Sequence, residues 1–165
     1  MEVSGSSRFA PEARTTAYVG LGSNLGDREH LLNSALGALR DADGVKVVRM
    51  SRFHETKPVG GPSGQRDFLN AVAEIRVTLT PRELLNTLLS IEADHGRVRD
   101  VRNGPRSLDL DLLLFGGVRV DEPGLQVPHP RMWDRAFVLA PLAELVDVTA
   151  LREQWSSIAE YARAG

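Results

Sequence analysis

The spacing of hydrophobic positions changes along this chain, and each change predicts a new element. Residues 15–24 form a largely apolar run that ends in glycines, which predicts a buried strand. Hydrophobic residues then recur every three or four positions, which predicts a helix from Asp27, its N-cap, to about residue 40. The apolar face of this helix carries Leu31, Leu32, Ala35 and Leu39.

Two further strands are expected on either side of a long loop. Residues 45–53 have the composition of a strand, and residues 68–79 alternate between an apolar and a mixed face. Residues 55–67 lie between them and contain two prolines and three glycines, which predicts a loop. A loop of this length is typical of a lid or a binding loop.

The clearest helix signal begins at Thr80. Thr80 and Glu83 have the spacing of a capping box, and Pro81 stands at the first helical position. We therefore expect a helix that runs to about His95 and is closed by Gly96.

The last third of the chain mixes loops with short elements. Residues 96–106 predict an arginine-rich loop, and residues 107–117 predict a strand that ends in a glycine turn. Residues 118–120 are expected to complete a hairpin with that strand. Residues 127–145 predict a loop that leads into a short helix, and an amphipathic segment follows over about residues 151–162.

The predicted order is strand, helix, strand, strand, helix, strand, which is the split βαβ plan of ferredoxin-like folds. We expect an α+β sandwich in which helices pack on a mainly antiparallel sheet. Residues 1–14 show no periodicity and predict a disordered tail, so residues 15–165 are expected to form a single domain.

Composition narrows the range of possible functions. The net charge of −2 lacks the positive field with which proteins bind duplex nucleic acid, so we expect no nucleic-acid partner. The absence of cysteine excludes disulfides and thiolate metal sites. No segment has the roughly 18 apolar residues of a membrane span, and the first residues contain no signal-peptide core, so we expect a cytoplasmic protein without membrane contact.

The strongest chemical signal is an acidic pair in an apolar strand. Alternation turns Leu108, Leu110, Leu112 and Leu114 to the core. Asp109 and Asp111 then lie on the opposite face, roughly 7 Å apart along the strand. Carboxylates at this spacing suit one or two Mg²⁺ ions, although ion pairs with nearby arginines are the competing interpretation.

Basic residues surround the acidic pair in the sequence, as expected for a polyphosphate site. They are Arg97, Arg99, Arg102, Arg106, His129, Arg131 and Arg135. No P-loop motif is present, so the expected nucleotide site is of another type. Phe68 and Phe137 with Asn70 would suit a flat heterocycle, although core packing is the better explanation of the two phenylalanines taken alone.

Three strings carry a family resemblance: RNGPRSLDLDLLLFG, VPHPRMWDRAFVL about a dozen residues later, and AYVGLGSNLGDR near the start. Together they resemble hydroxymethyl-dihydropterin pyrophosphokinase of the folate pathway, over roughly Ala17 to Leu145. The resemblance implies transfer of pyrophosphate from ATP to 6-hydroxymethyl-7,8-dihydropterin, with small-molecule substrates and a monomeric protein.

The resemblance also implies roles for individual residues. Asp109 and Asp111 would bind two Mg²⁺ ions, while Arg97 and Arg106 would act on the triphosphate. The ATP site would comprise Glu92, Leu112, Gly124, Leu125, Gln126, His129 and Arg135. The pterin site would comprise Thr56, Val59, Phe68, Asn70 and Phe137.

The sequence departs from the family pattern at three positions. Phe68 stands where tyrosine is frequent, Asn103 where tryptophan is frequent, and Pro130 where tyrosine can follow the histidine. The change at Asn103 bears on how the pterin pocket is sealed, and none of the three removes a charged or metal-binding group.

Other function classes fit less well. A dinucleotide-dependent oxidoreductase is one alternative, because the glycines between Gly20 and Gly26 resemble a dinucleotide-binding fingerprint. Their spacing differs from that fingerprint, however, and no second βαβ unit follows. Another Mg²⁺-dependent nucleotide transferase that uses the acidic pair is a second alternative. A non-enzymatic ferredoxin-like binding module is a third, although its expected aromatic and basic surface is not indicated by the composition.

Overall fold

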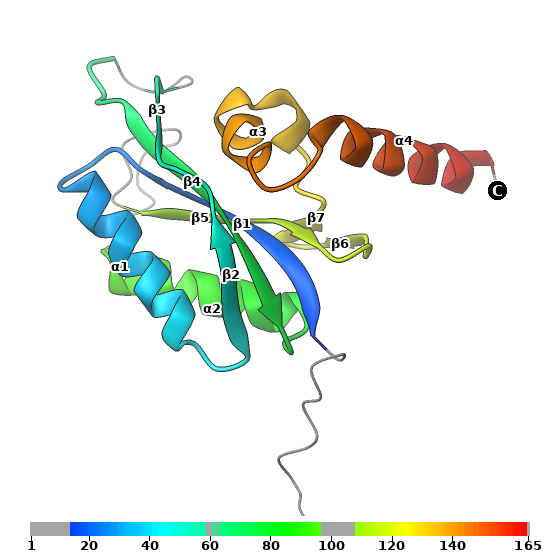
Figure 1. The fold of residues 1–165 in the computed structure, drawn as a ribbon, viewed down its shortest axis with the longest axis horizontal. Helices are drawn as coiled ribbons and strands as arrows, with labels where there is room; N and C mark the ends of the chain where they lie inside the picture. The colour runs from blue at the N-terminus through cyan, green and yellow to red at the C-terminus, as the bar shows by residue number, and fades with distance from the viewer. Residues whose placement is uncertain (1–13, 59–60, 62, 97–107, 165) are drawn as a thin grey trace, which may run out of the picture.

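The computed structural model describes residues 14–58, 61, 63–96 and 108–164, with side chains described as far as residue 156. A five-stranded antiparallel sheet in the order β2-β4-β1-β5, with β3 paired to β4, forms the centre of the fold (Figure 1). Its strands are β1 (Thr15–Ser23), β2 (Val45–Met50), β3 (His54–Thr56), β4 (Phe68–Val77) and β5 (Asp109–Phe115). This order confirms the predicted ferredoxin-like α+β sandwich.

Helices cover both faces of the sheet. α1 (Arg28–Asp41) and α2 (Pro81–Asp94) pack on one face, and α3 (Ala136–Leu142) and α4 (Val148–Ala164) lie on the other side (Figure 1). A separate hairpin of β6 (Val120–Glu122) and β7 (Leu125–Val127) lies beside β5, and a 3-10 turn, η3 (Met132–Asp134), precedes α3. Within the described residues, no helix has both the length and the apolar character needed to cross a membrane.

Local signals explain where the first two helices begin. Asp27 accepts a hydrogen bond from the backbone of His30 (3.1 Å), as expected of an N-cap. The Thr80 hydroxyl accepts a bond from the backbone of Glu83 (3.1 Å), and the Glu83 carboxylate accepts one from the backbone of Thr80 (2.9 Å). The predicted capping box is confirmed, and Gly96 follows α2 with a positive φ of 75°.

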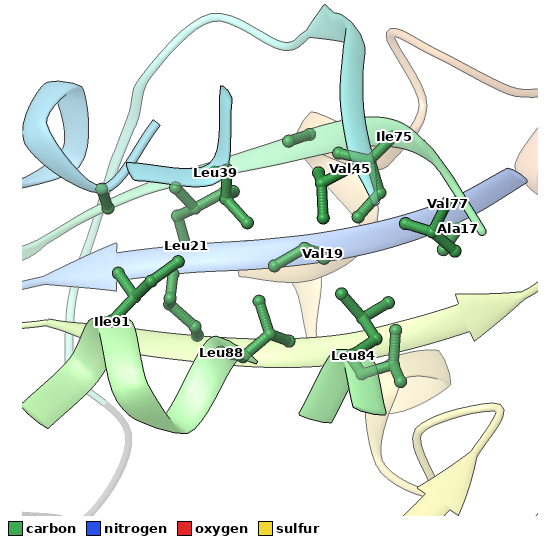
Figure 2. Packing of buried hydrophobic residues seen from close by; sticks show 14 of the residues in the cluster. Ala17, Val19, Leu21, Leu39, Val45, Ile75, Val77, Leu84, Leu88 and Ile91 are labelled. Atoms are coloured by element: carbon green, nitrogen blue, oxygen red, sulfur yellow. The ribbon is translucent and has the colours of Figure 1, made fainter. Parts of the chain in front are cut away.

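Two hydrophobic clusters stabilise the two faces. The larger cluster joins β1 and β4 to α1 and α2 through side chains that interdigitate across the sheet surface, including Val19, Leu21, Leu39, Leu84 and Leu88 (Figure 2). The smaller cluster joins the opposite face to α3 and α4 and includes Val72, Leu113, Met132, Leu142 and Trp155. Most residues of β1, β4 and β5 are therefore buried or half-buried, whereas β2 at the edge of the sheet is partly exposed.

The alternation of β5 is interrupted once, where its register against β1 shifts. Val19 pairs with Leu112 and Tyr18 pairs with Leu114, so Leu113 is an extra residue. Leu110 and Leu112 pack in the larger cluster, whereas Leu113 and Leu114 pack in the smaller one. The expectation that Leu114 shares a face with Leu110 is therefore wrong.

Three other predictions need correction. Residues 118–120 do not pair with the acidic strand; β6 pairs with β7 instead. The predicted loop over residues 55–67 begins with part of a strand, because β3 pairs with β4. The last helix starts at Val148, three residues before the predicted segment. The predicted tail falls almost wholly on residues 1–13, outside the described residues.

Candidate active site

The two aspartates are placed by pairing with glycines on the neighbouring strand. Asp109 pairs with Gly22 and Asp111 pairs with Gly20, and both aspartates are half-buried. Residues directly opposite each other in a sheet project from the same face. Because glycine has no side chain, other residues fill this part of the face: Leu113 lies over Gly20, and Asn70 and Phe68 lie over Gly22.

The row of paired residues that contains Asp109 and Gly22 extends across the sheet to Asn70. Gly22 pairs with Asn70 of β4 on its other side. A Cβ atom at position 22 would lie 2.8 Å from Asn70 Oδ1 and 3.7 Å from the Phe68 ring. The Asn70 amide also donates to the hydroxyl of Thr56 (2.5 Å). Two predicted pterin residues, Asn70 and Phe68, therefore lie over Gly22, and a third, Thr56, hydrogen-bonds to Asn70.

Phe137 approaches this face from another element. It stands at the start of α3, which packs against β3 and β4. Its ring is half-buried against the smaller cluster, and the Arg135 guanidinium lies 5.4 Å from the ring centroid. Core packing thus accounts for part of this ring, as the sequence allowed. Val59, the remaining predicted pterin residue, lies outside the described residues.

His129 lies close enough to Asp109 and Arg135 for their charges to affect it. Its backbone N–H donates to Leu113 O (2.9 Å), and its ring Nδ1 accepts a bond from the Arg131 backbone (3.2 Å). Burial lowers the pKa of His129 below its usual 6.5; Arg135 and Arg131 act in the same direction, and Asp109 opposes them. The ring is therefore neutral at pH 7 with its proton on Nε2, which makes Nε2 a hydrogen-bond donor.

A cavity of about 1060 Å³ opens at the outer edge of β5, between α2 and the β6–β7 hairpin. Both aspartates line it, as do all the predicted ATP residues except Arg135. These are Glu92, Leu112, Gly124, Leu125, Gln126 and His129. The cavity is large enough for a nucleotide, and its wall joins apolar side chains to carboxylates and a histidine.

Pro130 also lines this cavity, whereas the predicted catalytic residues Arg97 and Arg106 lie outside the described residues, together with Asn103. Arg82, at the start of α2, lines the cavity as well and was not predicted. It forms an ion pair with Glu122 (2.9 Å) and donates to Pro123 O (3.2 Å). A contact between segments 40 residues apart leaves no local pattern by which the sequence could have indicated it.

Glu92 has a second relationship to the site. Its side chain is almost completely buried, and its Oε2 accepts a hydrogen bond from the backbone N–H of Leu110 (2.7 Å). Leu110 stands between the two aspartates. The family resemblance implies a place for Glu92 in the nucleotide site, and no pattern in the sequence indicates its contact with Leu110.

A group of contacts also anchors the segment that leads into β4. The buried Asn24 amide donates to Gln65 Oε1 (3.2 Å) and Arg66 O (3.1 Å), and Arg28 donates to Asp67 O (2.8 Å). The end of the glycine-rich loop is thus fastened to the turn between β1 and α1. The GSN triplet at Gly22–Asn24 is the sequence signal that could have revealed this anchor.

The carboxylates of Asp109 and Asp111 suit a hard cation whose other ligands are water or substrate oxygens. Within the described part of the chain, no group of three or more His, Asp or Glu side chains is placed to hold a metal. Asp109 and Asp111 carry oxygen donors on one face, and both line the cavity beside β5. Mg²⁺ commonly binds through one or two carboxylates, with water and substrate phosphates completing its shell.

Comparison with known proteins finds one matching family model and several similar proteins. Residues 18–147 match the family model described as 7,8-dihydro-6-hydroxymethylpterin-pyrophosphokinase. The chain is 50% identical over 129 residues to the 2-amino-4-hydroxy-6-hydroxymethyldihydropteridine pyrophosphokinase of Bacillus subtilis, covering 78% of this chain and 77% of that protein. It is 47% identical over 128 residues to the protein of the same name from Pseudomonas aeruginosa, covering 78% of each chain. The protein of that name from Methylorubrum extorquens is 47% identical over 131 residues, which are 79% of this chain and 82% of the relative.

Proposed function

Because the chain belongs to the 7,8-dihydro-6-hydroxymethylpterin-pyrophosphokinase family and is an ATP-dependent pyrophosphokinase of folate biosynthesis, we propose that its reaction takes place along the row Asn70–Gly22–Asp109. This row supports the proposal because it carries an amide for the acceptor on one side and a metal-binding carboxylate on the other. Neighbouring strands are about 4.8 Å apart, so the two groups start from backbones separated by roughly 10 Å. That span suits a pterin ring whose hydroxymethyl group reaches towards a bound polyphosphate.

The pterin side would consist of an amide between two rings. Phe68 and Phe137 would stack on the heterocycle, and Asn70 would hydrogen-bond to its edge. The bond from Asn70 to Thr56 orients the amide, with Oδ1 directed to the space that the missing side chain of Gly22 leaves. Thr56 and Val59 would contact the ring through their backbones.

The nucleotide side would occupy the cavity beside β5. Leu112 with Gly124, Leu125 and Gln126 would line the adenine pocket, and the phosphates would extend towards Asp109 and Asp111. The neutral His129 would donate from Nε2 to a phosphate oxygen, with Arg135 adding positive charge.

Asp109 and Asp111 would hold two Mg²⁺ ions, which when bound would neutralise negative charge on the polyphosphate. The hydroxymethyl oxygen of the pterin attacks the β-phosphorus of ATP, and AMP leaves. Arg97 and Arg106 would supply positive charge as the bond to the leaving AMP breaks. A loose transition state requires little prior proton removal, so no general base is assigned.

The direct test is to incubate the full chain with ATP, Mg²⁺ and 6-hydroxymethyl-7,8-dihydropterin and to separate the nucleotides. AMP and the pterin diphosphate are expected in equal amounts. ADP in place of AMP would mean transfer of the γ-phosphoryl group alone and would contradict the proposal. We further propose a monomer that acts in the cytoplasm; light scattering after gel filtration tests the first point, and cell fractionation tests the second.

A further inference from the structure

The backbone between the two aspartates is held by a side chain from another element. β5 is the terminal strand of the five-stranded sheet, so no strand among the described residues pairs with its outer edge. At this edge the N–H of Leu110 donates to Glu92 Oε2 on α2 (2.7 Å). β1 holds the flanking Asp109 and Asp111 from the other side. The acidic segment is therefore fixed along both edges.

Burial of the Glu92 carboxylate costs free energy. Its residue surface is 3% exposed, and glutamate is rarely buried to that extent unless it is paired. It lies in the last turns of α2, where the helix dipole disfavours negative charge, and it lines the same cavity as four other carboxylates. A hydrogen bond from a backbone amide to a carboxylate is charge-assisted and offsets part of this cost.

We propose that Glu92 is a positioning residue, which acts through the Leu110 backbone to hold the carboxylates of Asp109 and Asp111 at the spacing that binds metal. The inference rests on the proposed function, because it presupposes that the aspartates are the metal ligands. Groups that orient metal ligands typically contribute 10- to 100-fold to metal affinity, so loss of Glu92 should weaken metal binding by about that factor. Direct contact between Glu92 and the nucleotide is the rival role, and it would leave the strand unaffected.

Three full-length variants separate the two roles. Glu92→Gln keeps an oxygen that can accept from Leu110 but removes the charge, whereas Glu92→Ala removes both. Asp94→Ala is the matched control, because it deletes an exposed carboxylate from the end of the same helix. Two quantities are measured: the affinity for Mn²⁺ in the presence of α,β-methylene ATP, followed by electron paramagnetic resonance, and the hydrogen-exchange rate of the Leu110 amide, followed by NMR.

Glu92→Ala is expected to lower Mn²⁺ affinity at least tenfold and to speed Leu110 exchange at least tenfold. Glu92→Gln and Asp94→Ala should stay within about threefold of the unsubstituted protein in both measurements. Two results would overturn the inference. The first is that Glu92→Gln and Glu92→Ala lose Mn²⁺ affinity equally while the Leu110 amide stays protected from exchange. The second is that Glu92→Ala binds Mn²⁺ with unchanged affinity.

If Glu92→Ala does not fold, Glu92→Gln alone decides: retained Mn²⁺ affinity supports positioning, and a tenfold loss overturns it. The two failures are distinguishable. If the unsubstituted protein binds no Mn²⁺ with the ATP analogue, the proposed metal site fails, whereas normal binding there with no effect of Glu92→Ala refutes this inference alone.

Discussion

Asn70 and Asp109 belong to β4 and β5, which lie on opposite sides of β1, and both residues pair with Gly22. One strand on each side of a glycine thus brings a predicted pterin residue and a predicted metal ligand into a single row. Since Gly22 separates the two substrates' binding groups, a side chain at this position should disturb the pterin end of the row.

Gly22→Ala is expected to weaken pterin binding at least tenfold, about 1.4 kcal/mol. Its Cβ would lie 2.8 Å from Asn70 Oδ1, so the amide must move away from the ring edge. Gly20→Ala is the matched control, because a Cβ there would meet only Leu113 atoms at 3.6 Å or more. Calorimetric titration with the pterin measures both variants. Equal affinities for the two would contradict the role of the row.

Removal of either aspartate should abolish turnover without unfolding the protein. We expect Asp109→Ala and Asp111→Ala each to lower kcat by about a thousandfold, about 4 kcal/mol, because charge on the phosphates is no longer neutralised. Asp43→Ala, at an exposed position in the turn before β2, is the control and should be fully active. AMP formation measures activity and circular dichroism measures folding; full activity of either site variant would rule out this metal site.

Asn24→Ala should loosen the segment that leads into Phe68. The buried amide makes two hydrogen bonds across to residues 65 and 66, and their loss should cost about 2 kcal/mol in the free energy of unfolding. The pterin KM should rise more than the ATP KM, because the released segment continues into β4. Denaturant melts and initial rates test this. A larger effect on ATP would show that the anchor serves the other substrate.

The pH dependence of stability should include a contribution from Glu144. This carboxylate accepts from the Arg52 backbone (2.9 Å) and bonds to His54, and these contacts hold its pKa below the usual 4.5. A lowered carboxyl pKa stabilises the fold above the unfolded-state value and loses that effect as the pH falls through the folded-state value. The stability difference between the unsubstituted protein and Glu144→Gln should therefore be present at pH 6 and shrink below about pH 4.5. Thermal melts across this range provide the test, and a difference that grows on acidification would contradict it.

Short-range signals predicted much of the fold. Asp27, Thr80 and Glu83 marked helix starts because capping depends on residues three positions apart. The alternation of β4 and the acidic pair of β5 also placed side chains on the faces where the structure has them, since strand periodicity is local. The family resemblance, rather than periodicity, supplied the ATP and pterin residues.

Long-range features could not be predicted in this way. The bond from Glu92 to Leu110 depends on how α2 docks beside β5, and no pattern within either segment encodes that docking. The β6–β7 hairpin was missed because each strand has only three residues, too few to establish a period. The predicted face of Leu114 was wrong because Leu113 has no partner in the register against β1 and so reverses the alternation.

That extra residue makes Leu113 the position at which β5 can lose a residue and keep its pairing with β1. Upstream of Leu113 the strand directs its leucines to the helices α1 and α2, and downstream it directs Leu114 to α3 and α4. Deletion of Leu113 would restore uniform alternation and keep Leu114 and Phe115 on the sides where they now lie. Insertion of one residue into the regular part of the strand would exchange the sides of the residues beyond it. Such an insertion should therefore destabilise the fold more than deletion of Leu113.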